Sequence, residues 1–88
     1  MSAERLVMMA NQIGRFFAHE GERAPVSIAG HIRSFWDPRM RAAILQHLDA
    51  GGTGLDPAVR EALQRLRASA PAPVRARLAG AGDKADGR

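Results

Sequence analysis

Residues 28–41 read IAGHIRSFWDPRMR and contain the only tryptophan of the chain, together with three arginines. The Asp37-Pro38 pair divides this stretch into two parts. Proline disfavours a helical conformation at the residue before it, and it suits the first position of a new helix. The stretch therefore predicts one helix that ends at Trp36 and another that begins at Pro38, with Asp37 as its N-cap.

The segment before this stretch predicts a first helix, which begins after Ser2 and runs to about His19. Its apolar residues recur at spacings of three and four, as on one buried helical face: Leu6, Met9, Ala10, Ile13, Phe16 and Phe17. Four residues fall off this face: Val7, Met8, Asn11 and Gly14. They form either a second surface that contacts a partner, or a wider core with a close helix crossing at Gly14.

The second predicted helix, residues 26–36, also carries one apolar face, made by Ile28, Ala29, Ile32, Phe35 and Trp36. The third buries Met40, Ile44 and Leu48 and ends at the glycines of residues 51–54, which form a hinge or a tight loop. Asp56-Pro57 opens a fourth helix, whose expected buried residues are Val59, Ala62, Leu63, Leu66 and Ala70. We expect an all-α fold: a small compact domain of three to four helices over residues 1–70, followed by a flexible, disordered Pro/Ala/Gly-rich tail over 71–88.

Composition narrows the classes of function. The chain has 88 residues and no cysteine, so disulfides, thiolate metal sites and cysteine nucleophiles are excluded. The residues beginning at Met1 do not resemble a signal peptide, and no apolar run reaches the ~20 residues of a membrane span. We expect a cytoplasmic protein without a membrane partner.

The formal net charge of +4 raises the possibility of a small basic nucleic-acid-binding helical regulator, which we keep as the alternative function. Arginine supplies nearly all of the positive charge, and it pairs with carboxylates at protein interfaces as readily as with phosphate. The helix that begins at Pro38 soon becomes Ala-Ala-Ile-Leu, which leaves few side chains to read base edges. Docking on a protein fits this pattern better than binding to DNA.

Catalytic chemistry finds little support in the sequence. His19, His31 and His47 are not spaced as a metal-binding pair, and no pattern places a nucleophile beside a base. We therefore expect no catalytic, cofactor-binding or metal-binding residue in this chain. The Phe35-Trp36 pair has two interpretations. It anchors the core, or one of its rings is an exposed interface residue that is surrounded by Arg33, Arg39 and Arg41.

Four sequence blocks carry a resemblance to a known family: MANQIGRFF at residues 9–17, IAGHI at 28–32, FWDPRMR at 35–41 and GLDP at 54–57. In this order and spacing they resemble the delta subunit of bacterial NAD-dependent, molybdenum- or tungsten-containing formate dehydrogenases, the FdsD family. The resemblance covers roughly residues 5–66 and leaves out the tail.

The resemblance implies a small non-catalytic subunit of a cytoplasmic hetero-oligomer, which docks on the large molybdenum- or tungsten-containing alpha subunit and supports its assembly, cofactor insertion or stability. The bis-molybdopterin guanine dinucleotide, iron-sulfur clusters, FMN and NAD are then expected in the partner subunits. A permanent subunit and a transient maturation factor both remain open. Residues at motif positions that are polar or aromatic beyond the needs of a core are expected to contact the alpha subunit: Asn11, Gln12, His31, Arg33, Trp36, Arg39 and Arg41.

Overall fold

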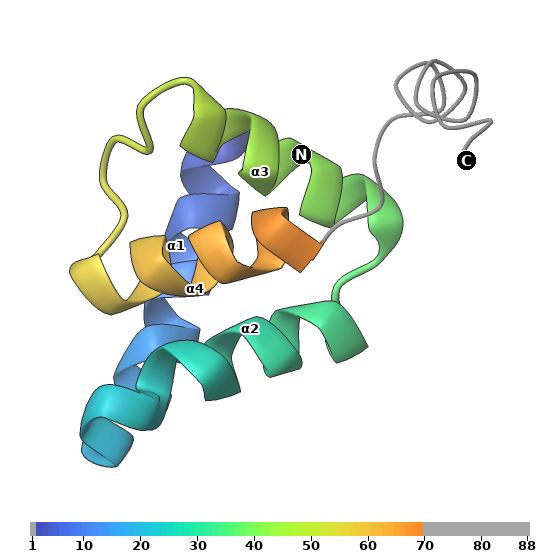
Figure 1. Ribbon diagram of the computed structural model, residues 1–88. Coiled ribbons are helices and arrows are strands. Elements are labelled where there is room, and N and C mark those ends of the chain that lie inside the picture. Colours follow the sequence, from blue (N-terminus) through green and yellow to red (C-terminus); the bar gives the residue numbers. More distant parts are fainter. Residues whose placement is uncertain (1, 70–88) are drawn as a thin grey trace, which may run out of the picture.

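A computed structural model describes residues 2–69, and within this range every regular element is a helix (Figure 1). The elements are α1 (Ala3–Phe16), the 3₁₀ helix η1 (Ala18–Arg23), α2 (Ala24–Phe35), α3 (Pro38–Asp49) and α4 (Pro57–Ser69). The all-α prediction is confirmed. Ala70 and the predicted tail lie outside the described residues.

The predicted helix starts are formed by the expected caps. The Ser2 hydroxyl oxygen accepts a hydrogen bond from the backbone N–H of Arg5 at 3.1 Å. The Asp37 carboxylate accepts one from the N–H of Met40 at 2.9 Å, and Pro38 is the first residue of α3. α1 is shorter than predicted, because it ends at Phe16 and the chain continues as η1 up to the start of α2.

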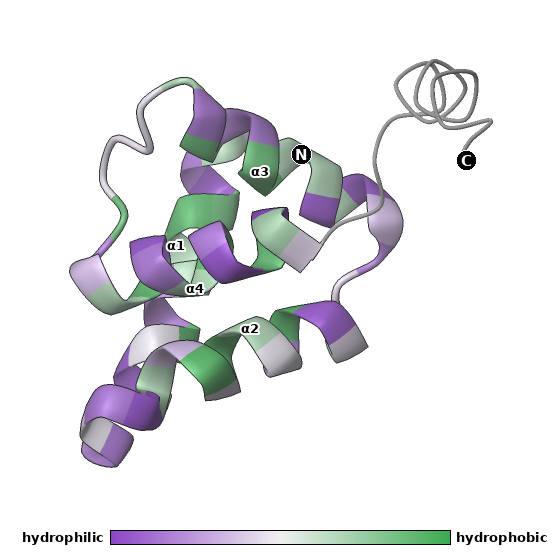
Figure 2. Cartoon of the chain, viewed as in Figure 1, coloured by the Kyte–Doolittle hydropathy of each residue, from purple (hydrophilic) through white to green (hydrophobic). Residues whose placement is uncertain are grey.

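The core lies where the four α-helices meet, and α2 and α4 share the most extensive helix-helix contact (Figure 1). Each helix supplies at least one large side chain that is almost fully buried: Leu6, Ile28, Ile32, Ile44, Val59 and Leu63. Away from this centre, the segment Ala18–Arg23 is predominantly hydrophilic (Figure 2) and none of its residues is buried. The described residues thus form one hydrophobic core with a polar outer connection.

The core face of α1 differs from the predicted one. The buried residues of α1 are Leu6, Val7, Ala10 and Gly14, which places the core face roughly 70° around the helix from the predicted stripe at 100° per residue. Gly14 explains the rotation. A Cβ atom at this position would lie 2.6 Å from Cγ2 of Val59, so the missing side chain lets α4 approach α1 closely. The close-crossing interpretation of Gly14 is confirmed, and Val7 belongs to the core.

Two glycines in helices give a matched test of this crossing. Gly14→Ala should lower the free energy of unfolding by about 1–3 kcal/mol, because its methyl group would overlap the fully buried Val59. Gly30→Ala should leave stability unchanged or raise it by up to ~1 kcal/mol, because a Cβ atom there meets nothing within 4 Å and alanine favours a helix. Urea unfolding followed by circular dichroism measures both changes. Equal stability of the two variants would contradict the close crossing.

Candidate docking groove

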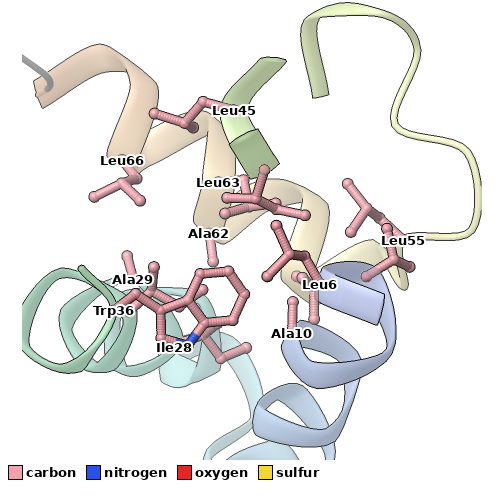
Figure 3. Close-up of a cluster of buried hydrophobic side chains, with 14 of the residues drawn as sticks. Leu6, Ala10, Ile28, Ala29, Trp36, Leu45, Leu55, Ala62, Leu63 and Leu66 are labelled. Atoms are coloured by element: carbon pink, nitrogen blue, oxygen red, sulfur yellow. The ribbon is translucent and has the colours of Figure 1, made fainter. Parts of the chain in front are cut away.

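The two rings of the Phe35-Trp36 pair have opposite environments: one lies in the core and the other is exposed to solvent. Only 5% of Trp36 is exposed, whereas 74% of Phe35 is exposed. Figure 3 shows the Trp36 indole among the buried side chains, beside Ile28 and Ala29 of α2 and next to Ala62 of α4. The core interpretation of Trp36 is therefore correct, and Phe35 is the aromatic residue of this pair that exposes its ring to solvent. The prediction that Phe35 belongs to the buried face was wrong.

The position of Phe35 along α2 explains its exposure. Phe35 lies seven residues, close to two full turns, beyond the buried Ile28, so both project from nearly the same side of α2. In Figure 1, however, the C-terminal end of α2 points away from α1, and Phe35 lies on this last turn of α2. Phe16 is likewise 72% exposed, because the rotation of α1 turns it out of the core. The prediction that Phe16 is buried was wrong for this reason.

Four rings form a continuous row from the end of α1 to the end of α2. Phe16 and Phe17 pack edge to face with their centroids 5.0 Å apart. Phe17 and His31 are 6.1 Å apart in a similar arrangement, and His31 and Phe35 are 4.7 Å apart with tilted planes. Aromatic pairs at such distances attract each other beyond their buried area, so the row holds its shape on the surface.

A groove of about 420 Å³ opens beside this row, between α1 and α2. Its lining is mostly apolar and comprises Met9, Gln12, Ile13, Phe16, Phe17, His31 and Trp36. Gln12, His31 and the Trp36 indole are its hydrogen-bonding groups. A concave apolar surface with a few polar groups is suited to binding a protruding apolar side chain.

The groove brings together three of the seven residues predicted to contact a partner: Gln12, His31 and Trp36. The structure places the other four elsewhere. Asn11 lies beside the loop before α4, while Arg33, Arg39 and Arg41 lie at and beyond the end of α2. Trp36 also offers a partner much less surface than predicted, because its ring fills the core.

Asn11 fixes α1 to the segment that precedes α4. Its side-chain N–H donates to the carbonyl oxygen of Gly54 at 2.9 Å, and its side-chain oxygen accepts from the N–H of Asp56 at 3.0 Å. The Arg60 guanidinium of α4 also donates to the carbonyl oxygens of Gly51 and Gly52, which ties this loop to α4. The geometry thus gives Asn11 a structural role, and its contact with a partner stays a prediction.

The three arginines near the helix break have different surroundings. The Arg41 guanidinium donates to the carbonyl oxygens of Arg33 and Trp36, which caps the end of α2. The Arg33 guanidinium donates to the Ser69 hydroxyl oxygen at 3.3 Å. Arg39 is exposed on the first turn of α3. Among these arginines, Arg39 is therefore the best placed for an intermolecular ion pair.

Sequence reasoning missed the apolar members of the groove, Met9, Ile13, Phe16 and Phe17, because their helical spacing is also that of a core face. One signal could have identified them. Consecutive residues on a helix point 100° apart, so Phe16 and Phe17 cannot both point to the centre of one core face. The buried glycine two residues earlier marks the side of α1 that faces α4.

Two kinds of feature are absent from residues 2–69. No helix between residues 2 and 69 has both the length and the apolar content needed to cross a membrane. In the same range, no three histidine, aspartate or glutamate side chains lie close enough together to hold a metal ion.

Comparisons with known proteins place the chain in one family. A model of the NADH-dependent formate dehydrogenase delta subunit, FdsD, matches residues 5–63. No curated protein and no solved structure matches the chain. The match covers α1 to most of α4, and thus includes the residues that line the groove.

The structural role of Asn11 can be tested by replacing it with alanine and using the neighbouring Gln12 as a control. Asn11→Ala should lower the free energy of unfolding by about 1–2 kcal/mol, because it leaves the Asp56 N–H and the Gly54 carbonyl without their partner. Gln12→Ala, one position along the helix, should change it by less than about 0.5 kcal/mol because this side chain is exposed. Thermal melts of the two variants measure the difference, and an Asn11→Ala melt equal to that of the wild type would contradict this role.

Proposed function

This chain belongs to the NADH-dependent formate dehydrogenase delta subunit family, and from this membership we propose that it is a non-catalytic subunit that docks on the alpha subunit of the enzyme. The alpha subunit is the large chain that holds molybdenum or tungsten. The delta subunit supports its assembly, cofactor insertion or stability within a cytoplasmic hetero-oligomer.

One observation carries the docking proposal. Phe16 and Phe35, at the two ends of the aromatic row, are each more than two-thirds exposed although each has a large apolar ring. Exposed aromatic residues at the surface of a small domain are typical of residues that dominate the binding energy of an interface. This favours a protein partner over nucleic acid, for which an arginine-rich face is the usual signature.

The chemistry of formate oxidation then belongs to the partner subunits. Iron-sulfur clusters are held mainly by cysteine thiolates, and this chain has no cysteine to supply them. We propose that the bis-molybdopterin guanine dinucleotide, the clusters, FMN and NAD all bind to other chains of the complex. The delta subunit contributes contact surface and no reacting group.

Purification of the tagged chain from a host that expresses the whole enzyme tests this function. The alpha subunit should be recovered with it in stoichiometric amount, because an apolar interface persists through washes with high salt. Recovery with active enzyme indicates a permanent subunit, and recovery only with apo-enzyme indicates a maturation factor. Recovery of nucleic acid without any dehydrogenase subunit, in a complex that dissociates steeply with salt, would contradict the proposal.

Arg39 tests the polar rim of the interface. Arg39→Ala should weaken binding to the alpha subunit by about two- to fivefold at low salt, and the effect should shrink at high salt because exposed ion pairs are screened. Arg65→Ala is the matched control, because Arg65 is an exposed arginine of α4 that already pairs with Glu61 at 3.3 Å. Surface plasmon resonance at two salt concentrations measures both, and equal losses for the two variants would contradict a specific role of Arg39.

A further inference from the structure

We draw no further inference here: the strongest candidate, the apolar groove between α1 and α2 beside the exposed rings of Phe16 and Phe35, carries nothing beyond the proposed docking, because nothing in the structure shows what covers it.

Discussion

The close crossing of α1 and α4 at Gly14 is the constraint on which the rest of the structure depends. The space that a side chain would need at this position is filled by the methyl group of Val59. The crossing turns Leu6, Val7 and Ala10 toward the centre of the domain. The same rotation turns Phe16 away from the centre and leaves Met9 and Ile13 only partly covered. The groove is therefore a consequence of how α1 packs on α4.

Trp36 links this core to the surface. Its ring occupies the centre beside Ile28 and Ala62, while its backbone ends α2 and its carbonyl oxygen accepts from Arg41 (Figure 3). Because the ring is held on both sides, the wall that it contributes to the groove has a fixed position. A preformed groove binds with a smaller loss of conformational entropy than a surface that must first be ordered.

The helices could be predicted from local chemistry because their boundaries depend on neighbouring residues. Pro38 is the first residue of α3 and Pro57 is the first residue of α4, and an aspartate precedes each proline. This helix-start signal involves only a few consecutive positions. The orientation of each helix depends on distant residues and could not be predicted in the same way. Phe16 and Phe35 have the spacing of core residues, and only the packing of α1 against α4 and the divergence of α2 from α1 expose them.

The candidate site also combines features that local sequence patterns predict with features that depend on distant residues. Gln12, His31 and Trp36 were identified from the sequence because they are polar or aromatic residues within family motifs, and the structure gathers them in one groove. Asn11 shares these features, but its amide is engaged by Gly54 and Asp56 across 43 and 45 residues of sequence. Such long-range hydrogen bonds have no local signature, so sequence reasoning could not separate a structural amide from one that is available to a partner.

A structure of the assembled formate dehydrogenase with this chain bound is the most direct test of the central claim. The account predicts that the alpha subunit covers the exposed rings of Phe16 and Phe35. A complex in which both rings face solvent, while another surface of the domain contacts the alpha subunit, would contradict it.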